Sequence, residues 1–256
     1  MKRVYKNWLV RITIGFAAIT SARLLSTLFH VTTLEKLYKP RDFRQTKHHV
    51  ISQDIVDRLP RYCQTIFGRK MDPINLVFVG SEKAINHAFA EAGWDGAHPS
   101  TPIHVTLGFA SSLFNKNYRK GPFMPLFISV GLQDISFQKI TDNGYAQRHH
   151  IRLWRTRHVL RSGQRVWVGA ATFEKSFKFK FRPPFVHHFK DPDIDWERDY
   201  IVEELLKHGG ILGESYQFNQ PIHKDKPAKD PNGDSYYTNG VAKVIELPEP
   251  VLIAKN

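Results

Sequence analysis

Cysteine is almost absent from this chain, and so are the short motifs of the commonest nucleotide-binding and hydrolytic sites. Among 256 residues there is one cysteine, Cys63, which excludes an internal disulfide framework and a cysteine-rich zinc site. The sequence contains no P-loop, no G-x-S-x-G nucleophile elbow and no G-x-G-x-x-G loop. It also has no finger motif and no RNP-like motif.

Positive charge is abundant and uneven. The net charge is +13, and the first fifty residues contribute +8 of it, with ten Lys and Arg against Glu35 and Asp42. A basic arm around an apolar stretch indicates a membrane surface before it indicates nucleic acid. Because the arm lacks dense interleaving of basic and aromatic residues, we expect no nucleic-acid partner.

The apolar stretch lies in residues 1–31, where positions 12–22 carry no charge. Eleven helical residues cover roughly 16 Å, about half of a hydrocarbon core. A full span over residues 8–29 requires Arg11 and Arg23 to extend their side chains outward. A single membrane anchor is the preferred interpretation, with a cleaved signal peptide or an interfacial helix as alternatives. Basic residues on both sides leave the topology open.

Four segments follow from the pattern of the whole chain. The expected divisions are an anchor helix (1–31), a linker with a helix (32–72), an α+β domain (73–212) and a C-terminal extension with one or two strands (213–256). The central segment begins with the buried strand DPINLVFVG and a helix capped by Ser81. Residues 104–114 are a weaker helix candidate because of Gly108 and two β-branched residues.

Strands and one helix fill the rest of the central segment. A meander of antiparallel strands is expected over about residues 126–181, with a tight turn at Asn143-Gly144. DPDIDWERDYIVEELLKHGG predicts a helix with Asp191 as its N-cap. Helices and antiparallel strands are segregated, so we predict an α+β fold: a mainly antiparallel sheet with helices packed on it, preceded by the N-terminal membrane-associated helix.

Five ordered motifs carry a resemblance to a known family. They are DPINLVFVGSEKAINHAFAEAGW, QDISFQKI, RHHIRLW (148–154), VWVGAATF and HHFKDPDIDWERD. Over about residues 73–212 the chain resembles LssY C-terminal-like domains. The resemblance implies a bacterial protein in which an N-terminal apolar helix precedes the domain. It also implies the company of membrane modules of the DedA or lipid-phosphatase type, and no particular chemistry.

The stretch RHHIRLW places a charged face on one strand. His149, Ile151 and Leu153 alternate with a set that faces the other way: Arg148, His150, Arg152 and Trp154. The second face requires counter-charges or an anion, and we expect Arg148 or Arg152 to pair with an acid between Asp191 and Asp199. The candidate binding residues are this second face together with Asp195 and Arg198.

Two further hypotheses use the histidine pairs. A metal site would draw on His150, His188, Asp191 and Asp193, although their spacing matches no short zinc motif. A catalytic site would draw on His150, His187, His188 and Asp191. The acidic stretch is not a calcium loop, because Trp196 occupies the position that requires glycine.

These patterns favour a membrane-anchored domain of the bacterial cell envelope, single-pass or peripheral, with the extracytoplasmic side preferred. The preferred function is a non-enzymatic module that binds an anionic partner or a lipid headgroup. The alternative is a hydrolase that uses the His/Asp cluster, with phosphate-containing compounds as candidate substrates. Membrane lipid is the expected partner through the N-terminal helix, and a membrane protein is a candidate second partner. The sequence names no cofactor.

Overall fold

The computed structural model describes residues 48–65, 67–98, 102–113, 118–129, 131–179 and 186–250, together with positions 15, 18, 21, 22, 44 and 45. Those four positions of the expected N-terminal helix, 15, 18, 21 and 22, are helical, and the rest of that prediction lies outside the described residues. None of the described helices is long and apolar enough to cross a membrane.

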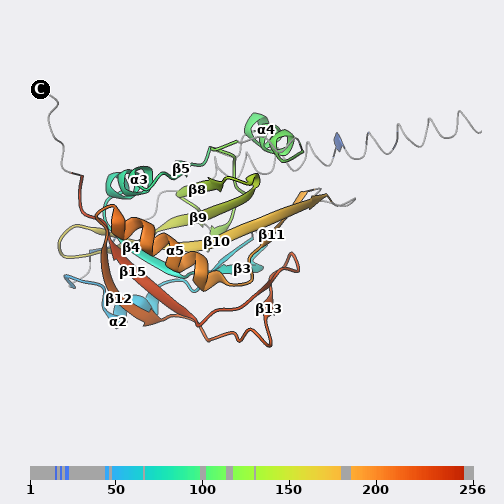
Figure 1. The fold of residues 1–256 in the computed structure, drawn as a ribbon. Coiled ribbons are helices and arrows are strands. Elements are labelled where there is room, and N and C mark those ends of the chain that lie inside the picture. The colour runs from blue at the N-terminus through green and yellow to red at the C-terminus, as the bar shows by residue number, and fades with distance from the viewer. Residues whose placement is uncertain are drawn as a thin grey trace, which may run out of the picture.

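A nine-stranded sheet forms the centre of the fold (Figure 1). Its main path runs β12 (Ile211–Gln217), β15 (Val241–Glu246), β4 (Leu76–Val79), β10 (Arg165–Phe179), β9 (Gly144–Val159), β8 (Ile135–Thr141) and β5 (Asp95–Gly96). Two strands lie off this path: β11 (Val186–Lys190) pairs with β10, and β1 (Arg44–Gln45) pairs with β9. The pairs β15–β4 and β1–β9 are parallel and the other pairs of this sheet are antiparallel, so the mainly antiparallel α+β fold is confirmed.

Two small sheets accompany the large one. The first contains β3 (Lys70–Pro73), β2 (Tyr62–Gln64), β6 (Phe127–Ile128) and β7 (Gly131–Leu132). The second is the pair β13 (Ala228–Lys229) and β14 (Ser235–Tyr236). Strands of the expected linker and extension thus share one fold with the central segment, since β2 pairs with β6 and β15 lies directly beside β4.

Capping residues set the helix limits. α3 (Glu82–Glu91) begins after Ser81, whose hydroxyl accepts a hydrogen bond from the Ala84 amide, as predicted. α5 (Ile194–Lys207) is capped by Asp193, not by Asp191, because the Asp193 carboxylate accepts the Trp196 amide. α2 (Gln53–Arg58) stops before Pro60. α4 (Pro102–Leu113) forms despite Gly108.

The hairpin between β8 and β9 is present, but its turn differs from the prediction. Thr141 pairs with Gly144, so the two loop residues are Asp142 and Asn143. Neither of them is among the residues with positive φ, which excludes the type I′ turn expected at Asn143-Gly144. The register shifts between Ile140 and Thr141, and this irregularity moves the turn by one residue.

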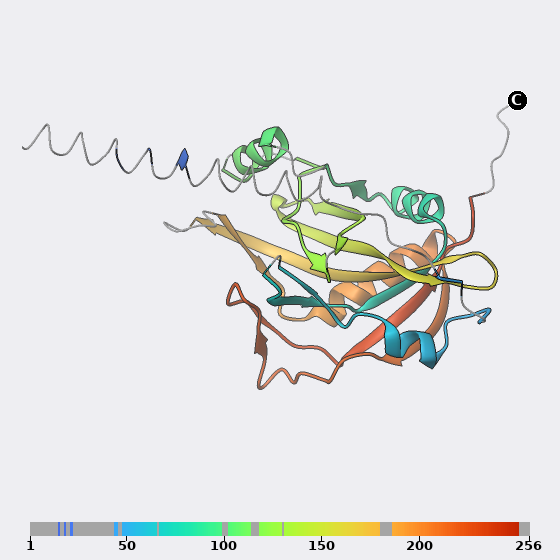
Figure 2. The same cartoon turned by 180° about the vertical axis from the view of Figure 1, so that it is seen from behind.

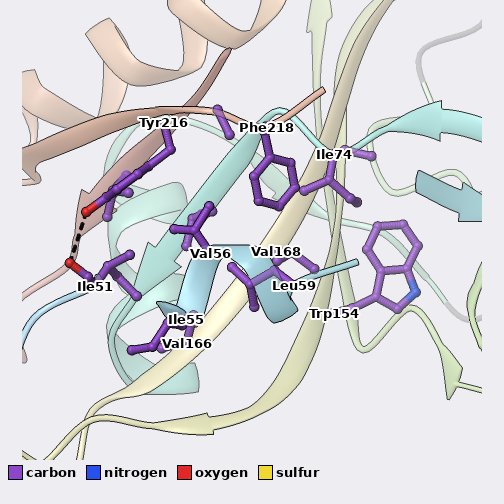
Figure 3. Close-up of a cluster of buried hydrophobic side chains, with 14 of the residues drawn as sticks. Ile51, Ile55, Val56, Leu59, Ile74, Trp154, Val166, Val168, Tyr216 and Phe218 are labelled. Atoms are coloured by element: carbon purple, nitrogen blue, oxygen red, sulfur yellow. Dashed lines mark hydrogen bonds between the residues drawn. The ribbon is translucent and has the colours of Figure 1, made fainter. Parts of the chain in front are cut away.

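The sheet has an apolar core on each face. On one face α3 and α5 cover Ile151, Leu153 and Trp167. On the other face α2 and the small sheet around β2 cover Trp154, Val166 and Val168 (Figures 2 and 3). In this second core the Tyr216 hydroxyl donates to the Ile51 carbonyl at 3.0 Å, joining β12 to the segment before α2.

Candidate functional site

Strand β9 sends its side chains to both faces of the sheet in the predicted alternation. Ile151 and Leu153 belong to the core under α3 and α5, and Trp154 belongs to the opposite core. Trp154 is fully buried, so this candidate binding residue packs inside the protein. Arg148, His150 and Arg152 are also buried, at 3%, 2% and 6% exposure, on the Trp154 face.

Arg148 is neutralised by a neighbouring strand. Its Nε donates to Glu174 Oε2 at 2.6 Å, and Glu174 lies opposite it in the β9–β10 register. Its Nη1 donates to Gln138 Oε1 at 2.9 Å, on the other neighbour, β8. Both partners are at least nine-tenths buried, so the pair is held in a site from which water is excluded.

His150 is held by two donors. Arg152 Nη1 lies 3.0 Å and Thr172 Oγ1 2.8 Å from His150 Nε2, which makes Nε2 the acceptor and places the ring proton on Nδ1. Glu174 Oε1 is 3.7 Å from Nδ1, too far for a hydrogen bond. Burial lowers the pKa of His150 to about 3, so the ring is neutral near pH 7.

Asp72 and Lys190 extend the cluster towards β3 and β11. Arg152 Nη1 lies 3.8 Å from Asp72 Oδ2, and Lys190 Nζ donates to Asp72 Oδ1 at 2.5 Å. Lys190 also pairs with Asp230 Oδ2 at 2.5 Å. Burial would raise the pKa of Asp72, but Lys190 and Arg152 outweigh it and lower the pKa.

We call these seven side chains the buried charge cluster: Asp72, Arg148, His150, Arg152, Glu174, Lys190 and Asp230. Three cations face three carboxylates, and His150 is neutral, so the cluster balances its own charge. Two buried nitrogens, His150 Nδ1 and Arg152 Nε, have no hydrogen-bond partner in the described part of the chain. The cluster is a closed network that joins β3, β9, β10, β11 and the loop after β13.

The predicted pairing of Arg148 or Arg152 with an acid between Asp191 and Asp199 is wrong. Their partners are Glu174 and Asp72, because α5 covers the opposite face of the sheet. The acidic stretch has other partners. Asp191 pairs with Lys175 at 2.7 Å, and Asp193 caps α5 and accepts the Tyr237 hydroxyl at 3.2 Å.

Asp195 and Arg198, two further candidate binding residues, join α5 to the segment before β15. Arg198 Nη1 donates to Asp195 Oδ1 at 2.9 Å and to the Val241 carbonyl at 2.8 Å. Asp195 also accepts the Thr238 hydroxyl at 2.7 Å. Arg198 is 2% exposed, so these groups bind the protein's own chain.

Glu197 contacts His149, a pairing that was not predicted from the sequence. Its Oε2 lies 2.7 Å from His149 Nδ1, and Glu197, a residue of α5, is fully buried. Burial raises the pKa of Glu197 well above its usual range and lowers the pKa of His149 to about 4. The His149 ring stacks on Tyr200 at 4.1 Å between centroids, beside Phe173. The two adjacent histidines therefore serve two different faces.

The strand register keeps His150 and His188, two of the candidate metal ligands, apart. His150 pairs with Thr172 on one side of β10, whereas His188 pairs with Phe177 on the other side. Thr172 and Phe177 are five residues apart in β10, which corresponds to about 16 Å along the strand. His187 lies next to His188 in β11, and only the backbone of both is described. Among the described residues no group of three or more His, Cys, Asp or Glu could hold a metal ion.

An open groove lies outside the buried charge cluster, beside β2, β3 and the end of β12. Its volume is about 470 Å³, and its wall contains two cations, Arg61 and Lys70, two aromatic rings, four amide side chains and no acid. Arg61 Cζ lies 4.2 Å from the ring centroid of Phe218, which the core holds in place (Figure 3). Arg61 Nη1 is buried and has no hydrogen-bond partner among the residues described.

Asp57 only weakly neutralises the groove. Its Oδ1 lies 3.6 Å from Arg61 Nη2, and the Asp57 side chain is 60% exposed. Lys70 Nζ lies 5.1 Å from the ring centroid of Tyr62 and is exposed to solvent. Neither Arg61 nor Lys70 could be predicted as a site residue, because both lie in the expected linker, where no local pattern distinguishes them from surface charges.

Fold and site together define an α+β domain with a buried, charge-balanced cluster in its interior and a cationic groove on its surface. The chain belongs to the LssY C-terminus family, whose model matches residues 56–241. This match includes the end of α2 and the strands β2, β3 and β12, so the groove lies within the family domain. No curated protein and no solved structure matches the chain.

Proposed function

We propose that the protein is a membrane-anchored, non-enzymatic module of the bacterial envelope that binds an anionic group in the groove beside β2 and β3. The observation that carries the proposal is an open groove whose wall holds two cations, Arg61 and Lys70, and no acid. A guanidinium pairs well with the planar oxygens of a carboxylate or phosphate, and Lys70 adds a second positive charge. The net charge of +13 also favours the approach of anions.

The hydrolase alternative has less support. It requires His150 and an acid to converge in an open pocket. His150 is 2% exposed, and its Nε2 is engaged by Arg152 and Thr172. The acids next to it, Glu174 and Asp72, are occupied by Arg148 and Lys190. His150 Nε2 and the two acids nearest to His150 are thus engaged by partners inside the buried charge cluster.

Titration of the full chain in detergent with inorganic phosphate and with acetate tests the proposal. We expect saturable binding that Arg61→Gln weakens by at least about tenfold, because hydrogen bonds to charged groups contribute roughly 1.5–3 kcal/mol. Arg58→Gln is the matched control. It removes the same charge from the end of α2, where Arg58 is 65% exposed and pairs with Asp54. Equal weakening by both variants, or no saturable binding, would contradict the proposal.

A second measurement distinguishes the source of the anion. Vesicles containing phosphatidylglycerol should compete with phosphate for the groove if the natural ligand is a lipid headgroup, and should leave phosphate binding unchanged if the ligand is soluble. Hydrolysis of a phosphate ester by the unmodified protein, lost in His150→Gln, would support the hydrolase instead.

A further inference from the structure

Helix α4 has an apolar surface that the rest of the described chain does not cover. Its twelve residues, PIHVTLGFASSL, contain no charge. Ile103 and Leu107 are 66% and 48% exposed, and they lie four positions apart, on the same side of the helix. Figures 1 and 2 both place α4 at the upper edge of the fold, above the large sheet. A charge-free helix with two large exposed side chains on one side is typical of a docking surface.

Cations follow this helix in the chain. Arg119 and Lys120 lie in the next described segment, and both are exposed. Arg119 Nε donates to Asp95 Oδ2 at 2.8 Å, which fixes the turn, while its side chain remains 69% exposed. The first turn of α4 is tied to the same region, because His104 stacks on His98 at 4.4 Å and His98 Nδ1 lies 2.9 Å from the Tyr118 hydroxyl.

We propose that α4 is a membrane-docking surface that inserts Ile103 and Leu107 into an anionic lipid bilayer, with Arg119 and Lys120 contacting the headgroups. Twelve helical residues cover about 18 Å, too short to cross a hydrocarbon core, so the helix lies along the interface. Two observations favour lipid as the occupant. The exposed cations complement anionic headgroups, and the chain carries an uncharged apolar run at residues 12–22, outside the described domain, that is suited to keep it at a membrane.

This inference does not depend on the groove, but it constrains the ligand. In both Figure 1 and Figure 2, α2 lies at the lower side of the fold, opposite α4, and Arg61 comes three residues after the end of α2. With α4 on the bilayer, α2 lies on the side of the fold away from that bilayer. This placement favours a soluble anion over a headgroup of the same membrane as the ligand of the groove.

The single cysteine makes a sharp test possible. Cys63 is fully buried, and burial raises its pKa, so it does not compete with an introduced thiol. Ile103→Cys, labelled with a polarity-sensitive fluorophore, is introduced into the full chain and reconstituted into mixed phosphatidylcholine–phosphatidylglycerol vesicles. Asn232→Cys, in the exposed loop between β13 and β14 on the side away from α4, is the control. The label at 103 should shift to the blue and be quenched by spin-labelled lipid; the label at 232 should do neither.

Charge substitutions in the labelled protein complete the design. Arg119→Gln and Lys120→Gln should weaken docking of the label roughly fivefold for each cation removed. Vesicles of phosphatidylcholine alone should reproduce the effect of the double substitution. A label at 103 that stays in a water-like environment while the chain is membrane-bound would overturn the proposal. So would a label that is equally shielded without vesicles, since α4 would then be covered by protein.

Discussion

His149 and His150 are neighbours in the chain, yet they lie on opposite faces of one strand and differ in how their surroundings handle charge. His150 belongs to a network in which three cations balance three carboxylates, across at least four strands. His149 has one partner, Glu197, and a shell of aromatic rings. On the His150 face the side chains keep their charges and are paired, whereas on the other face His149 and Glu197 are both neutral.

The difference follows from what packs against each face. Opposite His150, the small sheet brings Asp72, the long strand β10 brings Glu174 and the short strand β11 brings Lys190, so charge can be matched by charge. Opposite His149, α5 brings a single carboxyl group into an apolar core. An isolated carboxylate there is strongly disfavoured by desolvation, and the group takes up a proton instead.

Removing a cation from the buried charge cluster should cause the largest loss of stability. Arg148→Ala leaves Glu174 buried without its cation, and we expect the free energy of unfolding to fall by about 3–5 kcal/mol. Arg58→Ala removes an exposed pair with Asp54 at 2.7 Å and should cost at most about 1 kcal/mol. Denaturant unfolding at pH 7 measures both. Similar losses for the two variants would mean that the charge cluster is open to water.

The register explains why this cluster could be predicted only in part. The alternation in RHHIRLW correctly separates His149 from the charged face, because a strand has a strict period of two. The alternation does not predict which residues lie opposite the charged side chains. At the turn Arg165 pairs with Val159, and this register, continued along the strands, would place Ser176 opposite Arg148. A shift between Arg165 and Trp167 brings Glu174 there instead.

The elements themselves were predicted more fully than their partners. Ser81 as a cap, the meander of β8, β9 and β10, and a helix over the acidic stretch all depend on local chemistry that a sequence carries. Asp72, Lys190 and Asp230 meet through three segments far apart in the chain, and no local pattern encodes that meeting. The assignment of the acids 191–199 to Arg148 and Arg152 failed because the sequence does not say which face α5 covers.

Acid should expose the second difference between the two histidines. Burial lowers the pKa of His150 to about 3, so below about pH 6.5 the unfolded chain binds a proton there that the folded protein does not. The free energy of unfolding should then decrease as the pH is lowered, by about 1.4 kcal/mol per pH unit, or about 2 kcal/mol between pH 6.5 and 5. The His149–Glu197 pair adds no slope in this window. It holds one proton in the folded state, on Glu197, and one in the unfolded state, on His149.

His150→Gln isolates this contribution, since the amide oxygen can still accept from Arg152 and Thr172. Unfolding free energies at pH 6.5 and 5 should differ less in the variant than in the unmodified protein, by about the 2 kcal/mol attributed to one proton. Parallel pH curves for the two proteins would show that His150 is already protonated in the fold.

Alkali should act on the other face, with the smallest effect. The pKa of Glu197 is raised by burial, so its stabilising contribution is complete below its usual value and is lost as the pH rises towards the raised value. Above about pH 6.5 the unfolded His149 no longer binds a proton that compensates, and the unmodified protein should lose up to about 1.4 kcal/mol between pH 7 and 8. Glu197→Gln keeps a donor for His149 Nδ1 and has no proton to lose, so its stability should stay level over this range. Denaturant unfolding at pH 7 and 8 measures how the free energy of unfolding changes with pH in the unmodified protein and in the variant. Equal changes would mean that Glu197 is ionised in the folded protein. Both faces of β9 would then carry charge.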